Sequence, residues 1–243
     1  LRAADYTLAA EAGKARWLGM PIADLSTLDR VLVVGSNLRK DHPLFAQRIR
    51  QSARKGAQVS ALVSHQPDWA LPVRNVLLAD AGYWTIALAG VAGAVAEAAG
   101  VQAPAQVEVT DAARAVAKSL LGGEHKAVLL GNAAAHHEQA SSLLALANWI
   151  AQHTGARVGY LTEAANTVGA QLVKAQPTSG LNATQMLTGG LKCALLLNME
   201  PGQDSAVCGK GLKTTDMVVT LSPFKTNLEA VSYTHLRAHE TPE

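Results

Sequence analysis

Three residues that follow an apolar segment near the start of the chain could contribute to an anion-binding site. Residues 31–34 read Val-Leu-Val-Val, and Gly35, Asn37 and His42 come before a helical pattern that begins at Pro43. This strand–turn–helix order is typical of nucleotide-binding α/β folds, in which the helix N-terminus presents free N–H groups to an anion. No glycine-rich fingerprint accompanies it. These residues alone therefore favour an ordinary βα turn over a working phosphate site.

A second set of loop residues recurs later in the chain. Gly131 and Asn132 follow the apolar segment 127–130, and Asn166 and Gly169 lie in a polar stretch further on. Ligands of open α/β sheets bind outside the carboxyl ends of the strands. These four residues and the three near the start are therefore the candidate cofactor-binding residues. The repeated strand–glycine–asparagine theme also predicts two related α/β units.

Other combinations of reactive residues do not support catalysis or metal binding. The residues His136-His137-Glu138 point in different directions at a helix start, and no partner stands at i+4. In residues 202–211, six residues rather than four separate the first two glycines, and Lys210 precedes Gly, so a phosphate-binding loop is rejected. There is no G-x-S-x-G elbow. We predict no catalytic residue and no metal ligand.

Composition limits the partners and the compartment. The chain has 243 residues, 49% hydrophobic and 16% charged, with a net charge of +2. Lys and Arg are scattered, so we expect no nucleic-acid partner. The two cysteines, Cys193 and Cys208, indicate a reducing compartment, and they are too few for an iron–sulfur cluster, which needs about four ligands. Cys193 lies in an apolar run, where we expect a buried strand residue.

One segment has to be tested as a membrane span. Residues 81–96 are uncharged but rich in Ala and Gly, and they fall short of the roughly 20 apolar residues that a span needs. A buried Ala-rich helix is the better interpretation, so we expect no direct membrane insertion. The chain begins at Leu1 without a basic segment, so we also expect no signal peptide.

The elements that position the candidate residues follow from periodicity and from breaker residues. The strands predicted from apolar runs are 31–35, 58–63, 76–78, 127–131, 157–161, 193–198 and 217–221, the last two expected to be buried. The predicted helices are 43–55, 83–99, 111–121 and 137–153. Residues 163–190 read as a long loop with one short helix near 184–187. Alternating strands and helices predict parallel sheets joined by right-handed crossovers.

These elements form two α/β units, with a boundary at a pair of glycines. The first unit covers residues 1–122 and contains Ala-rich helices, and the second covers residues 123–229. From residue 230 the apolar periodicity is lost. Residues 230–243 resemble a translated sequencing-adapter read-through, so we expect a non-native tail and exclude its His235 and His239 from any metal site.

Four segments, taken in order, resemble a known family. They are residues 35–43 with 48–50 and 55–57, then 129–137, 165–170 and 195–202. Together they resemble the molybdopterin-oxidoreductase domain in the large subunit of bacterial NADH-quinone oxidoreductase, respiratory complex I. The resemblance extends over almost all of residues 1–231. It implies two Rossmann-like parallel-sheet units, the second incomplete because it is part of a discontinuous domain, in an internal fragment of the large subunit.

The resemblance also implies where a cofactor would lie. In cofactor-bearing relatives the matching positions line a pterin-nucleotide cleft, which makes the seven candidate residues a vestigial cleft here. This chain departs from those relatives in two places. Residues 64–68 read Ser-His-Gln-Pro-Asp, where relatives carry Asp-Pro to hold the guanosine ribose. Residues 198–201 read Asn-Met-Glu-Pro in place of a Gly-Glu-Asn segment. Both departures favour a cleft that has lost its cofactor.

The function implied by the resemblance is structural. We expect a catalytically silent scaffold in the cytoplasmic peripheral arm, bound to the inner membrane only through the complex and in contact with other peripheral-arm subunits. The iron–sulfur clusters that carry electrons from NADH towards quinone would lie upstream. The alternative is a fragment of a molybdopterin-dependent oxidoreductase such as a formate dehydrogenase, with its catalytic residue upstream. A free-standing nucleotide-binding module is disfavoured by the truncated second unit.

Overall fold

The described residues fall into two compact units. The computed structural model describes residues 16–162, 164, 166–175, 180–205, 210–223 and 233–236, the last four by their backbone. The boundary between the units lies between residues 175 and 176. Each unit has its own parallel sheet and its own core.

The larger unit is built on a five-stranded parallel sheet. In spatial order its strands are β3 (Asn75–Leu78), β2 (Gln58–Val63), β1 (Arg30–Val34), β4 (Lys126–Leu130) and β5 (Arg157–Tyr160). The side chains of β1 and β4 after the first residue of each strand are buried on both faces. Such continuous Val, Leu and Ala runs are typical of parallel sheets covered on both sides.

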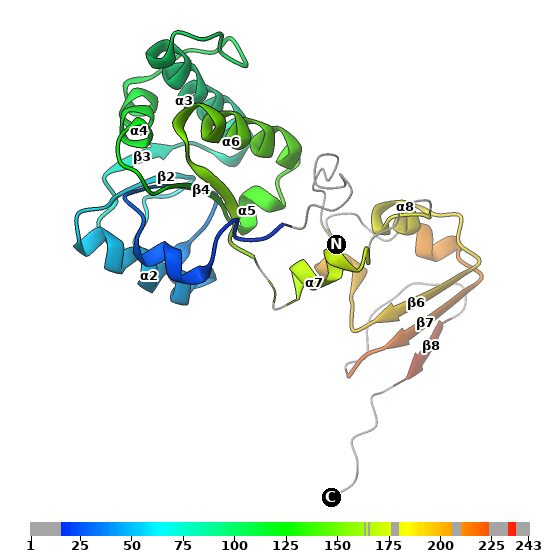
Figure 1. Ribbon diagram of the computed structural model, residues 1–243. Coiled ribbons are helices and arrows are strands. Elements are labelled where there is room, and N and C mark those ends of the chain that lie inside the picture. Colours follow the sequence, from blue (N-terminus) through cyan, green and yellow to red (C-terminus); the bar gives the residue numbers. More distant parts are fainter. Residues whose placement is uncertain are drawn as a thin grey trace, which may run out of the picture. The chain divides into compact units, whose positions relative to one another are not determined.

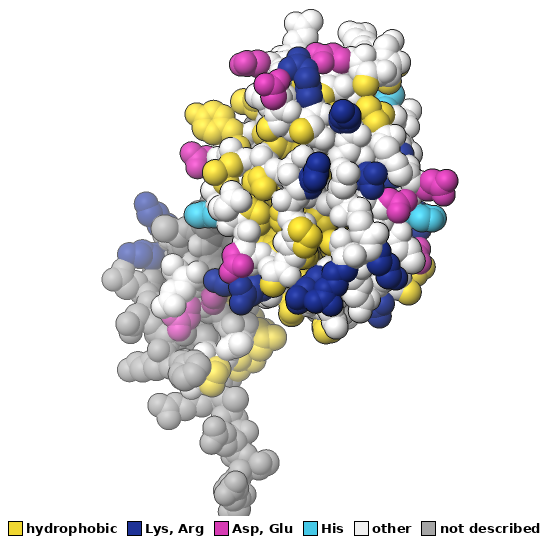
Figure 2. All heavy atoms as spheres, turned by 90° about the vertical axis from the view of Figure 1, so that its left-hand side faces the viewer, with side chains coloured by type: hydrophobic (Ala, Val, Ile, Leu, Met, Phe, Trp, Pro, Cys, Tyr) yellow, Lys and Arg dark blue, Asp and Glu magenta, His cyan; other side chains and the backbone are white. Residues whose placement is uncertain are grey.

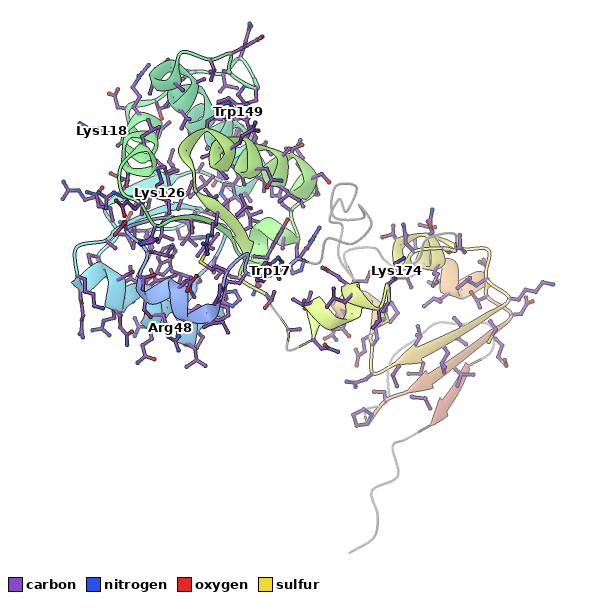
Figure 3. The ribbon with its side chains drawn as sticks, in the orientation of Figure 1. Trp17, Arg48, Lys118, Lys126, Trp149 and Lys174 are labelled. Carbon is purple, nitrogen blue, oxygen red and sulfur yellow. The ribbon has the colours of Figure 1, made fainter. Side chains whose placement is uncertain are left out.

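Helices cover both faces of this sheet, as Figures 1 and 3 show. One face packs against η1 (Ile22–Ser26), α1 (Leu38–Asp41) and α2 (Pro43–Arg54). The other packs against α3 (Trp84–Ala99), which η2 (Ala81–Tyr83) precedes, α4 (Asp111–Leu121), α5 (Asn132–Ala135) and α6 (Ala140–Thr154). The result is a three-layer α/β unit with a core on each side of the sheet.

Local sequence explains where the longer helices begin and end. Pro43 occupies the first position of α2, where its missing N–H costs nothing. Thr110 caps α4 by accepting a hydrogen bond from the Ala113 N–H. Gly100 and Gly155 end α3 and α6 in left-handed conformations, which glycine adopts without a Cβ penalty. Capping and breaker residues therefore predict these boundaries to within three residues.

The Ala-rich helix α3 is part of the core of the larger unit. By length and composition alone, residues 81–99 could cross a membrane. Ten residues between Trp84 and Ala96 are buried, however, and α3 packs against α4 and α6. A Cβ on Gly93 would lie 2.9 Å from Val109 Cγ2, so the helix needs small residues to pack this closely. The predicted buried Ala-rich helix is confirmed.

The smaller unit has a three-stranded parallel sheet in the order β6 (Cys193–Leu197), β7 (Met217–Leu221) and β8 (Tyr233–Leu236). Two further elements, α8 (Ala183–Thr188) and η3 (Lys210–Thr214), pack together on one side, and a short helix α9 (Pro201–Asp204) follows β6. The core is small. Its buried residues are Leu187, Ala194, Leu196, Leu212 and Val218.

The α/β class with parallel sheets is confirmed, but the domain boundary differs from the predicted one. β1 and β4 pair directly, with Val31 opposite Ala127, so residues on both sides of position 122 belong to one sheet. The two compact units divide at 175/176 instead. The glycines at 122–123 lie in the turn that joins α4 to β4, and a glycine-containing turn between a helix and a strand has the same composition as a linker between domains.

Three smaller expectations are also corrected. Cys193 is exposed rather than buried. Both strands that were expected to be buried, β6 and β7, alternate between buried side chains and more exposed ones. The predicted loop 163–190 contains a second helix, α7 (Thr167–Leu172). Cys208, Ala165 and His239 lie outside the described residues, and β8, which includes His235, falls inside the predicted tail. The foreign origin of that tail stays a prediction.

Candidate functional site

The strand order of the larger sheet reverses between β1 and β4. From β1 the chain moves outward through β2 to β3, then returns to the other side of β1 to form β4 and β5. In open α/β sheets, ligands bind in the crevice at such a switch point, outside the carboxyl ends of the strands. Gly35 follows β1 and Gly131 follows β4. The sequence-predicted residues of these two loops therefore meet at the switch point.

Two backbone hydrogen bonds join these loops. The Gly131 N–H donates to the Val34 carbonyl at 2.8 Å, and the Ala133 N–H donates to the Gly35 carbonyl at 3.0 Å. A Cβ added to Gly131 would lie 2.2 Å from the Ser36 Cβ. The N–H group of Ala133, in the first turn of α5, is thus already paired with protein, and the loops are in direct contact.

A tryptophan ring fills the space beside Gly35. Gly35 has a φ of +62°, and a Cβ there would lie 2.7 Å from both Trp84 Cζ3 and the Ala134 nitrogen. The Trp84 Nε1–H donates to the Ala79 carbonyl at 2.9 Å, and its ring stacks on His137 with centroids 5.8 Å apart. Glycine is required here so that protein can pack against the backbone.

Three polar side-chain atoms are buried around the joined loops. Ser36 and His42 are each 6% exposed. Within the part of the chain that the structure describes, Ser36 Oγ, His42 Nε2 and Asn132 Oδ1 are buried without a hydrogen-bond partner. Each such atom costs about 1–3 kcal/mol of desolvation. Since Ser36 Oγ and His42 Nε2 do not pair with each other, they do not form a nucleophile–base couple.

Burial favours the neutral form of the His42 imidazole. Desolvation lowers the pKa of its imidazole below the ordinary value of 6.5, while the Asp41 carboxylate and the nearby Asn132 side chain act in the opposite direction. The ring also stacks on Phe45, with centroids 5.9 Å apart. The buried, stacked position of the ring shows that this side chain takes part in packing.

Asn37 has a local structural role. Its Oδ1 accepts from the Lys40 N–H at 3.4 Å, which caps α1, and its own N–H donates to Asp41 Oδ2 at 2.8 Å. Both contacts lie within one turn of helix, as expected for an N-cap asparagine. The side chain that the sequence offers as a ligand group is thus already used to begin α1.

The last two predicted residues lie on a different element. Asn166 precedes α7 as its N-cap residue, and a Cβ on Gly169 would lie 2.0 Å from Asn166 Oδ1. α7 contributes Thr167 and Gln171 to a cavity of about 120 Å³ that Asn132 also lines. Asn166 and Gly169 shape this helix rather than line the cavity.

Sequence reasoning missed two residues of that cavity, Arg16 and Tyr160. The Arg16 guanidinium donates to the Ala135 carbonyl at 3.0 Å and lies 5.2 Å from the centre of the Tyr160 ring. Burial raises the pKa of Tyr160, and the Arg16 charge opposes that effect. No local motif marks either residue, because the fold joins positions more than 140 residues apart.

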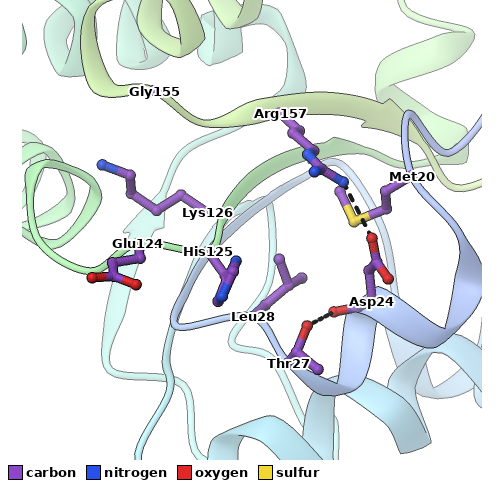
Figure 4. A pocket seen from close by; sticks show the side chains of 9 residues that line it. All are labelled: Met20, Asp24, Thr27, Leu28, Glu124, His125, Lys126, Gly155 and Arg157. Carbon is purple, nitrogen blue, oxygen red and sulfur yellow. Dashed lines mark hydrogen bonds and ion pairs between the residues drawn. The ribbon is translucent and has the colours of Figure 1, made fainter.

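A second cavity, of about 330 Å³, lies at the opposite, amino-terminal edge of the same sheet (Figure 4). Its main contact is an exposed ion pair in which Arg157 Nη1 lies 3.2 Å from Asp24 Oδ2. None of the seven candidate residues lines it. Figure 2 shows Lys and Arg interspersed with acidic and apolar side chains on one face of the molecule. The absence of a nucleic-acid partner stays a prediction.

The switch-point residues do not fit a pterin nucleotide. The first-turn N–H of Ala133 is already bonded, Trp84 fills the space beside Gly35, and the adjoining cavity of about 120 Å³ is small against the roughly 300–1,000 Å³ of ordinary ligand pockets. Among the described residues there is also no group of three or more His, Cys, Asp or Glu side chains that could hold a metal ion. We derive no catalytic step at this crevice.

Comparison with known proteins gives a family and a fold. The family model for molybdopterin oxidoreductase matches residues 1–232. A search of curated proteins finds no match. A solved chain of the formyltransferase/hydrolase complex from Methylorubrum extorquens, in complex with methylofuran, is 21% identical with a TM-score of 0.52. The alignment covers 87% of this chain and 62% of that one, so this chain spans less than two thirds of its solved neighbour, and the likeness shows the fold alone.

Proposed function

The chain belongs to the molybdopterin oxidoreductase family, and we propose that it is a structural, non-catalytic part of an electron-transferring oxidoreductase. The finer assignment is the large subunit of NADH-quinone oxidoreductase, as the four sequence motifs suggest. In that role the chain would support iron–sulfur domains elsewhere in the polypeptide and contact other subunits of the peripheral arm. It would lie in the cytoplasm and reach the inner membrane only through the complex.

One observation carries this proposal: the ligand crevice of the larger sheet is closed by the chain's own atoms. Hydrogen bonds join the loops after β1 and β4, and Trp84 packs on Gly35. A crevice that holds a nucleotide keeps its helix N–H groups free for phosphate. Here the fold retains the strand order of a nucleotide-binding site but leaves no space for a nucleotide. This supports the proposed scaffold role.

The solved chain described above is consistent with a fold that is kept without the family's reaction. It belongs to a formyltransferase/hydrolase complex in complex with methylofuran. A similar fold therefore occurs in a complex whose named activities are formyl transfer and hydrolysis rather than oxidation or reduction. The fold alone does not assign a reaction. The closed crevice of this chain supports a scaffold independently of that likeness.

The test is the cofactor content of the intact gene product, purified from a host that makes the pterin cofactor. We expect molybdenum, tungsten and extractable pterin all well below one per polypeptide, alongside iron from clusters elsewhere in the protein. A cofactor-bearing family member from the same host serves as the control for loading. Stoichiometric metal and pterin in the intact protein would overturn the scaffold assignment.

The second candidate is a fragment of a true molybdopterin-dependent enzyme such as a formate dehydrogenase. Two observations favour it: the family itself, and the three buried polar atoms at the switch point that lack partners among the described residues. Sequencing the intact gene separates the two candidates. Several four-cysteine clusters upstream support the large subunit of NADH-quinone oxidoreductase, whereas one cluster followed by a catalytic Cys or selenocysteine supports the enzyme.

A further inference from the structure

The helices α1 and α2, on one face of the larger sheet, are strongly basic. Residues 38–55, which include both helices, contain six Lys or Arg residues and one acidic residue, Asp41. The segment 80–124, which includes α3 and α4 of the opposite face, contains five acidic residues and two basic ones. On the face shown in Figure 2, Lys and Arg side chains gather in the lower part, at the height of α2 in Figure 1. The helices on the two faces of this sheet therefore belong to segments of opposite charge.

Most cations of α1 and α2 have no acidic partner. Arg39 pairs with Asp68, with Nη1 2.6 Å from Oδ2. The Asp41 carboxylate accepts a hydrogen bond from the Asn37 N–H. Within the part of the chain that the structure describes, the other five cations form no ion pair. They are Lys40, Arg48, Arg50, Arg54 and Lys55.

The order of residues along α2 leaves this charge unbalanced. Arg50 and Arg54 stand four positions apart, where like charges repel each other and weaken a helix. Gln47 and Gln51 each stand three residues before one of these arginines, at positions where a glutamate would form an ion pair with it. The helix dipole favours a cation in the last turn, such as Arg54, but not one in the middle of the helix. The stability of α2 therefore does not explain its charge, which favours a role in binding.

The exposed side of α2 has the composition of a protein interface. Leu44, at its start, is 74% exposed, and Gln47, Gln51 and Arg54 follow it at the spacing of one helix face and are also exposed. Arginine is enriched at protein interfaces and among the residues that contribute most to binding, whereas lysine is depleted. A helix that binds a membrane inserts its apolar face, but the apolar face of α2 is buried in the core of the larger unit.

We propose that the exposed side of α1 and α2 docks an acidic surface of another polypeptide. Carboxylates of that partner pair with Arg50, Arg54 and Lys55, and Leu44 contacts an apolar side chain of the same interface. The proposal adds a surface and the charge of a partner to the scaffold function. It does not depend on that function, because a cofactor-bearing protein could dock a partner through the same helix.

Cross-linking of the native assembly tests this docking surface. The intact gene product is purified at low salt together with the proteins bound to it, and a carbodiimide then joins lysine amines to carboxylates in direct contact. We expect mass spectrometry to find Lys40 or Lys55 joined to Asp or Glu residues of another polypeptide. Lys118 is the matched control, because it is exposed on α4 of the opposite face (Figure 3). It should give at least tenfold fewer such links.

Neutral variants of the intact protein measure the contribution of the charges. Arg50→Gln with Arg54→Gln removes two cations and keeps a good helix former. It should bind the cross-linked partner at least tenfold more weakly at low salt, and the difference should disappear at about 1 M salt, where the Debye length is about 3 Å. Arg114→Gln with Lys118→Gln removes two cations at the same spacing on α4 and should change the affinity less than twofold.

The proposal is overturned if Lys40 and Lys55 form no link to another polypeptide, or if their links lead only to a second copy of this chain. It is also overturned if both pairs of Gln substitutions affect the affinity equally. Binding of the purified intact protein to phosphatidylglycerol vesicles or to RNA, lost on substitution of Arg50 and Arg54, would assign the surface to a membrane or a nucleic acid instead. Cofactor content tests the scaffold function separately, so either proposal can fail without the other.

Discussion

The two sheets of this protein contain similar strands but are covered differently. In the five-stranded sheet, β1 buries Leu32 on one face and Val33 on the other, each against its own set of helices. In the three-stranded sheet, β6 buries Leu196 and exposes Leu197. Since both strands are runs of apolar residues, composition does not distinguish them. The direction in which the chain winds around each sheet does.

The same difference explains why the candidate site lies on the larger sheet. A switch point arises where winding changes direction, and the larger sheet changes direction between β1 and β4. Gly35 and Gly131 bring the two loops together there, but the contact is so close that hydrogen bonds replace a crevice. Winding in both directions creates the position of a ligand site, and the side chains at that position decide whether it is open.

The largest expected loss of stability comes from substitutions that test whether helices cover both faces of the larger sheet. Leu32→Ala and Leu129→Ala remove the same side chain from opposite faces, and both residues are fully buried. Each should lower the free energy of unfolding by about 3–4 kcal/mol. Denaturant titration followed by tryptophan fluorescence measures this unit alone, because Trp17, Trp69, Trp84 and Trp149 all precede residue 176.

A matched change at the surface provides the control for that pair. Leu44→Ala, at a residue of the same unit that is 74% exposed, should cost less than about 0.5 kcal/mol. If one face of the sheet tolerates Leu→Ala as well as Leu44 does, the larger sheet is not covered on both sides and the comparison fails.

The next largest loss of stability tests whether protein atoms fill the switch point beside Gly35. Gly35→Ala should cost about 2–4 kcal/mol, because the new Cβ overlaps Trp84 and the Ala134 backbone at a φ of +62°. Gly100→Ala is the matched control. Gly100 has a φ of +66° with nothing near its Cβ position, so only backbone strain of about 1–2 kcal/mol remains. Equal losses in the two variants would mean that the space beside Gly35 is open.

A smaller loss of stability is expected in the three-stranded sheet, of which only one face is covered. In the 243-residue chain, Leu196→Ala should lower the local stability of the small unit by about 2 kcal/mol, because it removes a buried side chain from a small core. Leu197→Ala, at the exposed neighbouring position, should change that stability by less than about 0.5 kcal/mol. Amide exchange of β6 and β7 measures both. Equal sensitivity at the two positions would show that the exposed face is already covered in this chain.

The smallest effect concerns pH. Burial lowers the pKa of His42 in the folded state, so the unfolded state binds more protons between the two pKa values. Stability is therefore full above about pH 6.5 and falls as the pH drops below it. The slope for one proton cannot exceed about 1.4 kcal/mol per pH unit. Denaturant titrations between pH 7.5 and 5 should show this loss, and His42→Gln should reduce it. An unchanged slope in the variant would assign the loss to another group.

The sequence predicted the elements better than it predicted their grouping. Capping and breaker residues placed α4 and β7 at the observed bounds, and α3 within one residue. The strand–glycine pattern placed five of the seven candidate residues after strands, as observed, but it predicted two separate units where the structure has both loops at one edge of one sheet. The predicted division at residue 122 differs from the observed one because a Gly-Gly turn before a strand has the composition of a linker. α7 was missed because a six-residue helix has too few turns to show periodicity.

The sequence by itself determined the α/β class, the parallel strands and the loops that carry the candidate residues, because these depend on local periodicity and on glycine and proline placement. Tertiary structure alone decided that β1 and β4 are neighbours, that Trp84 packs on Gly35, and that Leu197 is exposed while Leu196 is buried. Each of these contacts joins residues far apart in the chain or depends on the winding direction. Neither the long-range pairing of residues nor the winding direction can be recognised from the types of residue involved.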